Sequence, residues 1–556
     1  MAVLVEDKND IAEIISKIKD GSTVAISGFN ISVAPSFLIS ELYDNYRKTG
    51  HPRNLFIEAE CLPASPGKGL DLVTKDLYDH KDENFISGIM MPFLAWSPWL
   101  QKMTRENLIE AYTFSIGTAA AWFREVAASR PGLITSVGLG TFLDPSEEAT
   151  SMNERGKEAR RCYSSVLNIE GRDYLFYKAP KPDVAMIRGT TADEVGNMSM
   201  EDEAIFGTVL NIAQSAKAQP NPGIVMAQVE RIARFGSISP KDVHVPGPII
   251  DYVFVSPPEF AWQSSTIRYD PAISGTIIPP DPVNARRGKL TPENVIERRV
   301  ALEISRLVKQ LGKPIIMNLG IGIPTFVSDI IKEEGISKYV FSTVESGPWG
   351  GIPLGGENFG VSIGPFATIT MPDQFNLYEG GIIDLTSLGF LQIDREGNVN
   401  PSLLENRTPG PGGFPVISAG SPRVYFAGRF TANGLKESVG NSGITIQKEG
   451  DVIKFVNKVY KVLFNGKIAL RDQKEIMYIT ERAVFSLTDK GLVLKEKAPG
   501  IDLDKDILER MEFKPILPEE ITEMDPRIFR NRPMGLRTQI EKEFKKRSKQ
   551  SIALVG

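Results

Sequence analysis

The chain has 556 residues, and because a single hydrophobic core stops growing at roughly 250–300 residues, two domains are expected. A net charge of −5 without a basic stripe is atypical of a nucleic-acid binder. Three histidines and two cysteines disfavour a Ser-His-Asp hydrolase, a histidine-bound metal and a disulfide framework. No apolar run approaches the roughly 18 residues of a membrane span, so we predict a cytoplasmic protein without membrane or nucleic-acid partners.

A strand, a turn and a helix are predicted near the N-terminus. An earlier helix is expected over residues 9–19, where isoleucines recur at spacings of three and four. Residues 23–26 then have the composition of a buried strand, followed by a turn at Gly28 and Phe29 and by a helix beyond Pro35. This alternation of strands and helices indicates an open α/β sheet.

The same order recurs in the second half of the chain. The apolar run 315–317 precedes a turn at 318–323, then Pro324 and a further helix. The pattern Asp-x-x-Gly-Asn, which is typical of a tight hairpin turn, occurs at both 193–197 and 394–398. The strand–turn–helix unit and the Asp-x-x-Gly-Asn pattern thus recur in the same order in both halves. This repetition predicts a duplicated architecture of two related open α/β domains.

A Pro-rich and then basic stretch separates the two halves. Beyond it, Thr291 is a predicted N-cap and Pro292 the first residue of a helix. We therefore predict an N-terminal domain, a linker, a C-terminal domain and an extension. Their limits are residues 1–270, 271–290, 291–520 and 521–556.

Glu345 stands at the carboxyl end of the strand predicted over residues 339–344, before a Gly-rich turn at 347–351. Ligands bind at the carboxyl ends of strands in open α/β sheets, and a carboxylate there can act as nucleophile or base. An exposed glutamate on a turn is the alternative. Three further Gly-rich runs have two interpretations: they present backbone N–H groups to a ligand, or they are ordinary turns. These are residues 355–360, 378–384 and 410–414.

The run 344–351, Val-Glu-Ser-Gly-Pro-Trp-Gly-Gly, resembles the active-site motif of the glutamate-dependent (family I) CoA-transferases. The resemblance is closest to the fused acetate/propionate type, which is related to succinyl-CoA:3-ketoacid CoA-transferase, and it covers most of the chain. Other runs resemble the same family in the same order. They are residues 138–145, 188–193, 318–324 and 410–414.

The resemblance implies an enzyme of the EC 2.8.3 type with its active site between two related α/β domains. Such an enzyme moves CoA from an acyl-CoA to a small carboxylic acid, in short-chain fatty acid or ketone-body metabolism. Glu345 would carry CoA as a glutamyl thioester in a ping-pong reaction. CoA would be a substrate, with no tightly bound cofactor and no metal, and the chain would form a homo-oligomer, a dimer or a tetramer.

The resemblance also assigns roles to other positions. The backbone N–H of Gly381 or Ile382 would stabilise an oxyanion. Eight residues would bind substrate or CoA: Gly28, Phe29, Ile116, Gly140, Trp349, Gly350, Gly412 and Gly413.

Several positions depart from the family pattern. Ser27 and Val33 replace glycines of the N-terminal loop, Ile116 replaces a glutamine that helps the acid site in relatives, and Ile382 replaces a glycine. These departures predict an altered acyl site around an intact nucleophile. Two alternatives stay open: an acyl-CoA hydrolase on the same fold, and a CoA-binding sensor without catalysis.

Overall fold

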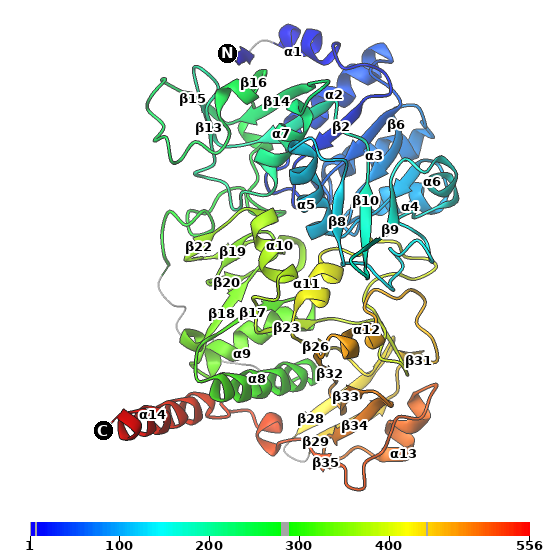
Figure 1. Ribbon diagram of the computed structural model, residues 1–556, viewed down its shortest axis with the longest axis vertical. Helices are drawn as coiled ribbons and strands as arrows, with labels where there is room; N and C mark the ends of the chain where they lie inside the picture. The colour runs from blue at the N-terminus through cyan, green and yellow to red at the C-terminus, as the bar shows by residue number, and fades with distance from the viewer. Residues whose placement is uncertain (1, 6–7, 280–288, 441–442, 556) are drawn as a thin grey trace. The chain divides into compact units, whose positions relative to one another are not determined.

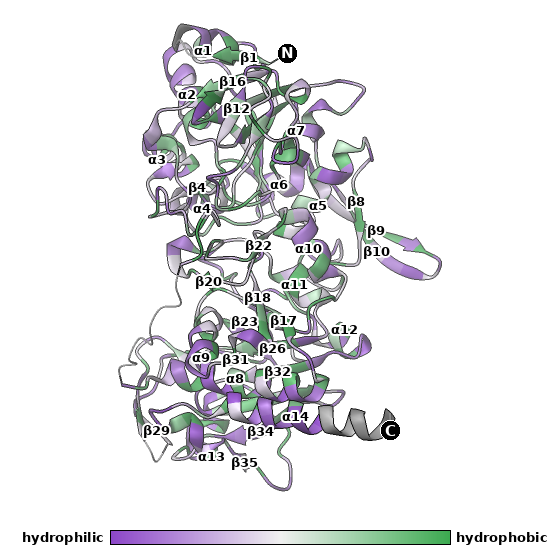
Figure 2. Cartoon of the chain, turned by 90° about the vertical axis from the view of Figure 1, so that its left-hand side faces the viewer, coloured by the Kyte–Doolittle hydropathy of each residue, from purple (hydrophilic) through white to green (hydrophobic). Residues whose placement is uncertain are grey.

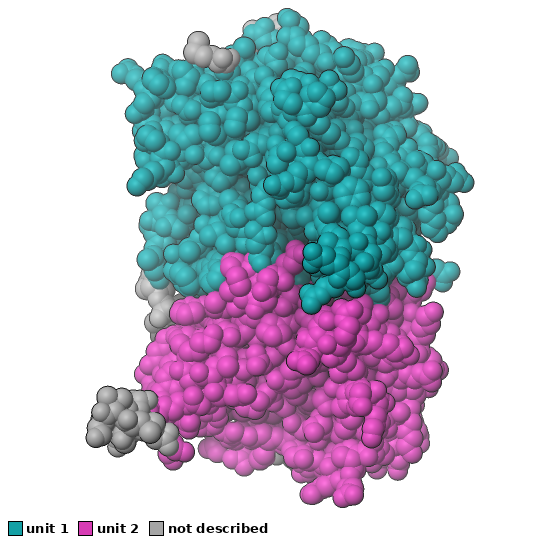
Figure 3. All heavy atoms as spheres, in the orientation of Figure 1, with its two compact units in different colours: residues 1–279, 344–376, 402–416 teal, residues 280–343, 377–401, 417–556 magenta. Residues whose placement is uncertain are grey.

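The computed structural model describes residues 2–5, 8–279, 289–440 and 443–555. The chain divides into two compact units, drawn in different colours in Figure 3. Unit 1 holds residues 1–279, 344–376 and 402–416, and unit 2 holds residues 280–343, 377–401 and 417–556. The chain therefore passes between the units several times. The domain limits expected from the sequence stay a prediction, and residues 280–288 of the expected linker lie outside the described residues.

Unit 1 is built on an eight-stranded parallel sheet (Figure 1). Its strand order is β1-β16-β14-β11-β2-β3-β6-β7. Strands β2 and β3 are buried along their whole length, as expected of a parallel sheet covered on both faces. The strand bounds are β1 Val3–Val5, β16 Tyr252–Val255, β14 Ile224–Val229, β11 Val184–Arg188, β2 Thr23–Ile26, β3 Leu55–Glu58, β6 Ile86–Met90 and β7 Glu110–Tyr112.

Helices of unit 1 follow the strands in the predicted alternation. The strand expected at residues 23–26 is β2, and the helix expected after Pro35 is α2. The helix expected over 9–19 is shorter and ends at Ile15. The main helices are α1 Lys8–Ile15, α2 Ser36–Thr49, α3 Leu70–His80, α4 Pro98–Arg105, α5 Ile116–Ala127 and α7 Val209–Lys217.

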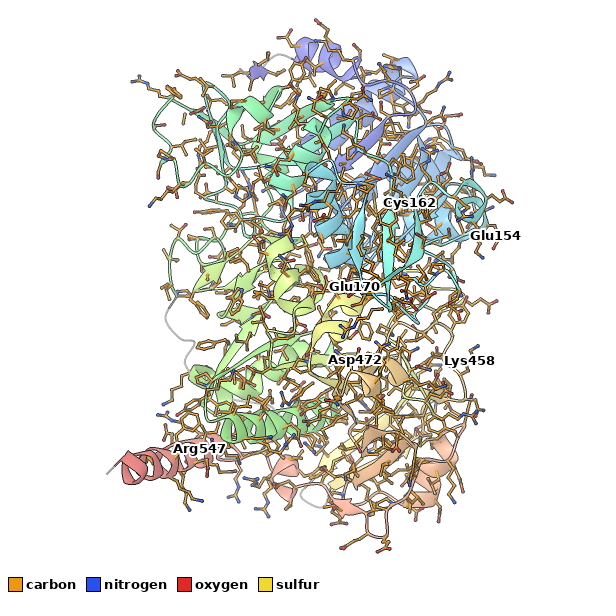
Figure 4. All side chains as sticks on the ribbon, in the orientation of Figure 1. Glu154, Cys162, Glu170, Lys458, Asp472 and Arg547 are labelled. Carbon is orange, nitrogen blue, oxygen red and sulfur yellow. The ribbon has the colours of Figure 1, made fainter. Side chains whose placement is uncertain are left out.

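A small antiparallel sheet is added to unit 1, in the order β8-β10-β9. The strands are β8 Leu133–Thr135, β9 Tyr163–Ile169 and β10 Arg172–Lys178, and Figure 2 shows the β9–β10 hairpin standing out from its surroundings. Glu170, labelled in Figure 4, and Gly171 form the hairpin turn with φ of 50° and 79°. Positive φ at both central residues matches the twist of the two strands.

Unit 2 is built on a second sheet whose strands within the unit run β18-β17-β23-β26-β32-β33-β34-β35. The first five are parallel, and β32, β33 and β34 are antiparallel neighbours. The bounds are β18 Val340–Thr343, β17 Ile315–Leu319, β23 Leu385–Leu388, β26 Arg423–Ala427, β32 Glu475–Ile479, β33 Ala483–Thr488, β34 Gly491–Lys497 and β35 Thr522–Glu523.

Helices of unit 2 come before, between and after these strands in the chain. Helix α8, Pro292–Leu311, begins as predicted, because Thr291 forms a capping box with Asn294 and Pro292 is the first helical residue. Helix α9 spans Val327–Glu333, and α14, which carries the labelled Arg547 of Figure 4, spans Leu536–Val555.

The duplicated architecture is confirmed by strand order. In unit 1 five parallel neighbours run β3-β2-β11-β14-β16, and in unit 2 they run β18-β17-β23-β26-β32. In each series the second strand comes first in the chain, its outer neighbour follows, and the remaining three come in order. The two sheets are therefore built by the same chain path.

The two Asp-x-x-Gly-Asn turns repeat the same hydrogen bonds. Asp193 accepts from the N–H groups two and four residues further on at 3.0 and 2.9 Å, and Asp394 does so at 3.0 and 3.0 Å. Asn197 and Asn398 each donate from Nδ2 to the other carboxylate oxygen, at 2.9 and 3.0 Å. This common turn is hairpin chemistry, as the sequence pattern predicts.

Candidate active site

Glu345 lies on a tight turn, residues 344–348, which belongs to unit 1 and follows β18 in the chain. The N–H of Val344 donates to the Pro348 carbonyl, and the N–H of Gly347 donates to the Val344 carbonyl, both at 2.9 Å. Gly347 has a φ of 127°, and a Cβ there would lie 2.1 Å from the Ile369 carbonyl oxygen. Only glycine therefore fits this turn, which fixes the place of Glu345.

The Glu345 side chain is buried, with 7% of its surface exposed. No hydrogen bond or ion pair reaches its carboxylate from any residue that the structure describes. Burial alone raises the pKa of Glu345 from 4.5 to about 8, because a charged carboxylate loses its hydration there. A buried carboxyl group with a strongly raised pKa and no neutralising partner is frequent at functional sites.

Gly413 lies directly against the Glu345 carboxylate. A Cβ at this position would be 1.8 Å from Glu345 Oε2 and 3.1 Å from the Phe375 ring. The N–H of Gly413 donates to no acceptor among the described residues. The nucleophile candidate thus has an uncommitted backbone donor beside it, which is what an oxyanion requires.

The Gly410–Gly413 loop is held in place by the N-terminal half of the chain. The Gly412 N–H donates to the Pro92 carbonyl at 3.0 Å, and the Gly412 carbonyl accepts from the N–H of Ile116 at 2.9 Å. Ile116 is the first residue of α5, and the loop is therefore docked on the start of that helix.

Phe375 connects this helix start with the nucleophile. A Cβ on Gly117, the second residue of α5, would lie 2.3 Å from the Phe375 ring, and the ring also borders Gly413. The structure therefore brings the predicted residues Ile116, Gly412 and Gly413 into the surroundings of Glu345. Phe375 was not predicted, since a lone aromatic residue on a helix carries no sequence signal.

Gly28 and Phe29 reach the Glu345 turn through a second Gly-rich run. The Phe29 ring covers Gly360, where a Cβ would lie 2.4 Å from the ring. The Ser346 hydroxyl donates to the Gly360 carbonyl. Phe29 and the turn that carries Glu345 therefore both contact Gly360. The Gly28 N–H donates to the Glu60 carboxylate at 3.1 Å.

Glu60 and Cys61 are buried acids that the sequence reading missed. Burial outweighs backbone hydrogen bonds and raises the pKa of Glu60 to about 7. Burial first, and then the nearby carboxylates of Glu345 and Glu60, raise the pKa of the Cys61 thiol. Acidic residues directly after the buried strand β3 were the available signal.

Trp349 and Gly350 continue the chain from the nucleophile turn. The Trp349 indole N–H donates to Gln374 Oε1 at 2.7 Å, and Gln374 is fully buried on α10, Met371–Glu379. Gly350 has a φ of 72° and lies under the Phe366 ring. A Cβ on Gly350 would be 2.4 Å from that ring.

Three predicted positions have other settings. The Gly140 N–H donates to the Asp144 carboxylate at 2.9 Å within its own loop. Gly381 and Ile382 lie in unit 2, where their N–H groups donate to the Tyr378 and Leu377 carbonyls, each at 3.0 Å. This pair of bonds closes the end of α10 as a Schellman motif, with Gly381 at a φ of 69°. Both predicted oxyanion donors are thus already engaged.

The described residues contain no group of three or more His, Cys, Asp or Glu side chains arranged to hold a metal ion. In the same part of the chain, no helix is both long and apolar enough to cross a membrane. Cys61 and Cys162 are free and buried.

Comparisons with known proteins find relatives that cover most of the chain. The Coenzyme A transferase family matches residues 8–256. Caffeate CoA-transferase of Acetobacterium woodii is 38% identical over 537 residues, which cover 94% of this chain and 97% of that protein. Acetate CoA-transferase YdiF of Escherichia coli (strain K12) is 34% identical over 530 residues, covering 94% and 95%.

A solved structure extends the likeness to the whole fold. The crystal structure of the acyl-CoA transferase YdiF from E. coli O157:H7, a thioester complex with CoA, has a TM-score of 0.84. It is 33% identical, and the match covers 96% of this chain and 97% of that one. The fold and the relatives define a CoA-transferring enzyme of the α/β class. The chain belongs to the coenzyme A transferase family, whose members are enzymes of the EC 2.8.3 type.

Proposed function

We propose that this protein transfers CoA from an acyl-CoA to a free carboxylic acid through a thioester on Glu345. The observation that carries the proposal is the Glu345 carboxylate, buried without a partner and pressed against Gly413, whose N–H is uncommitted. The solved YdiF relative is a thioester complex with CoA, which supports the same type of intermediate here.

The first half-reaction begins when a Glu345 oxygen attacks the acyl carbonyl carbon. The tetrahedral oxyanion accepts a hydrogen bond from the Gly413 N–H, and breakage of the C–S bond releases CoA thiolate and leaves a mixed anhydride. The thiolate then attacks the Glu345 carbonyl carbon, and the donor acid departs as a carboxylate. The product is the glutamyl-CoA thioester.

The second half-reaction runs these steps in reverse with another acid. Its carboxylate attacks the thioester, CoA thiolate leaves, and the thiolate then attacks the new acyl carbonyl to give the product acyl-CoA. Each half-reaction as a whole exchanges one thioester for another, and Glu345 is regenerated as a carboxylate. CoA is thus a substrate, and the chain's own residues supply the nucleophile and the donor.

The intermediate is the test of this function. The purified protein is incubated with acetyl-CoA and no acceptor acid, treated with hydroxylamine or borohydride, and digested for mass spectrometry. We expect modification of the peptide that contains Glu345 and release of at most one equivalent of acetate per site. Continuous release of free CoA would identify a hydrolase. If neither the modified peptide nor the release of CoA is observed, the protein is a CoA-binding sensor without catalysis.

The pH dependence of the first half-reaction gives a separate prediction. Because burial raises the pKa of Glu345 to about 8, the reactive carboxylate is the minor form of the free enzyme at pH 7. We expect kcat/KM for the acyl-CoA to rise about tenfold per pH unit and to level off near pH 8, since this ratio reports the free enzyme. A profile that is already flat above pH 5.5 would contradict it.

Cytoplasmic location and assembly into a homo-oligomer, both expected from the sequence, remain part of the proposal. Size-exclusion chromatography with light scattering measures the second directly.

A further inference from the structure

Strand β9 is a long, uncharged strand at the edge of its sheet. In the order β8-β10-β9 it comes last, so one side of its backbone has no neighbouring strand. The other edge strands that the structure describes in unit 1 have two or three residues, whereas β9 has seven. Its sequence holds no charge and no proline, and its pairing with β10 has no bulge. Short length, charge, proline and bulges keep edge strands from pairing with other chains, and β9 has none of these.

The hairpin turn determines which backbone groups of β9 point to this free edge. Ile169 and Arg172 flank a two-residue turn with positive φ at both central residues. Such a turn closes with a hydrogen bond between its flanking residues. Because bonded and non-bonded residues alternate along an antiparallel pair, Leu167 also bonds to β10. The N–H and C=O groups of Val166 and Asn168 therefore point away from β10.

Only the outer part of β9 is open. Near the base, Ser164 is buried and its hydroxyl donates to the Leu143 carbonyl at 2.6 Å. Towards the tip, Val166 and Ile169 have 47% and 44% of their surfaces exposed. This outer part belongs to the hairpin that stands out in Figure 2. The exposed residues whose backbone groups lack a strand partner are thus Val166 and Asn168.

We infer that this edge pairs with the β9 edge of a second copy of the chain, antiparallel and about a two-fold axis through Leu167. This is the axis that pairs both exposed outward residues, because it sets Val166 opposite Asn168 of the second copy and the reverse. The two pairs exchange four backbone hydrogen bonds, and the two three-stranded sheets become one of six strands. The inference gives a surface to the homo-oligomer that belongs to the proposed function.

Charges near the two ends of β9 favour a second copy over another partner. Glu170 in the turn and Arg160 before β9 are exposed, and neither has an ion-pair partner among the described residues. The Arg160 guanidinium stands over the Tyr163 ring, 6.0 Å from its centroid. The axis through Leu167 sets Glu170 opposite Ser164 of the second copy, beside that Tyr163 and Arg160. Opposite charges therefore meet at both ends of the paired edge, so the surface complements itself.

A cysteine at the axis tests this arrangement. The two Leu167 residues would form a pair without mutual backbone hydrogen bonds, whose Cα atoms lie about 4.5 Å apart. That separation is within the range of a disulfide. We expect Leu167→Cys to form a covalent dimer under mild oxidation, seen by electrophoresis without reductant. The native Cys61 and Cys162 are buried, and the wild-type protein should stay uncross-linked.

The matched control is Ile169→Cys on the same face of the same strand. Two copies of residue 169 would lie four positions apart along the paired strands, about 13 Å, which no disulfide spans. Cross-linking of this variant should be at least about tenfold slower than that of Leu167→Cys. Equal rates in the two variants, or no cross-link in Leu167→Cys, would overturn the inference.

A charge on the edge gives an independent measurement. Val166→Lys adds to β9 the kind of residue that protects edge strands, and it should halve the mass of the assembly measured by light scattering. Val166→Thr keeps a β-branched side chain and should keep the wild-type mass. Circular dichroism checks that both variants are folded. An unchanged mass in Val166→Lys would refute the pairing.

These measurements separate the surface from the proposed function. If the wild-type mass is that of an oligomer but Leu167→Cys does not cross-link, another surface joins the copies and only the assignment to β9 fails. A monomeric mass at every concentration would also remove the homo-oligomer. Neither result bears on the Glu345 thioester, which the trapping experiment tests by itself.

Discussion

Shortening Glu345 to aspartate is expected to lower CoA transfer by at least about 100-fold, because the carboxylate withdraws by one methylene and a displacement near 1 Å costs that much. Glu345→Gln should abolish transfer and thioester formation, since an amide is not a nucleophile of this kind. The measurement is steady-state transfer from acetyl-CoA, together with trapping of the intermediate.

The control for this prediction is the same change at a nearby exposed position. Glu357 lies in the turn Gly356–Asn358, which has no buried residues, and Glu357→Asp should leave transfer unchanged. Both Glu345 variants should stay folded, because neither breaks a hydrogen bond or ion pair: the buried carboxyl group has no partner among the described residues. Near-wild-type activity of Glu345→Asp would refute the nucleophile assignment.

Replacing Gly413 with alanine should also lower transfer by about 100-fold or more, because the new Cβ would occupy the place of Glu345 Oε2, 1.8 Å away. The carboxylate or the loop has to move. Gly413 has no positive φ, so its backbone accepts alanine and the loss arises from the contact with Glu345 rather than from local strain. Transfer rates and circular dichroism together measure the effect.

Gly412→Ala is the matched control for this loop. Gly412 has a φ of 60°, which is strained for alanine, but nothing lies within 4 Å of a Cβ there. This variant should lose stability, by about 1 kcal/mol for a left-handed residue, and should lose much less activity than Gly413→Ala. Equal losses in the two variants would mean that the loop, and not the crowding of Glu345, limits activity.

Local structure in this chain could be read from the sequence because it depends on neighbouring residues. The capping box at Thr291 and the two Asp-x-x-Gly-Asn turns are formed by side chains within five residues of one another. The duplicated architecture was predicted from the repeated pattern of these elements, and the order of the strands within each sheet was not. The place of Glu345 directly after a strand was predicted, but its burial was not, because an exposed glutamate on a turn fits the same local pattern.

Other features depend on contacts between distant segments, which no local pattern encodes. Phe375 and Gln374 matter because α10 meets the turns around Gly413 and Trp349. The oxyanion role expected for the N–H of Gly381 stays a prediction, and the structure shows a local competitor for that N–H, the Tyr378 carbonyl. A glycine directly beyond a helix is typical of a C-cap, and here it closes α10.

The path of the chain between the two units has a consequence for biosynthesis. Residues 1–279 are made first, yet unit 1 also needs residues 344–376 and 402–416. The nascent N-terminal half therefore waits, incomplete, while more than a hundred further residues are translated. Glu345 acquires its surroundings only after Gly413 has left the ribosome. If the gene were divided between the two halves, both polypeptides would have to be present in the same cell before the surroundings of Glu345 could form.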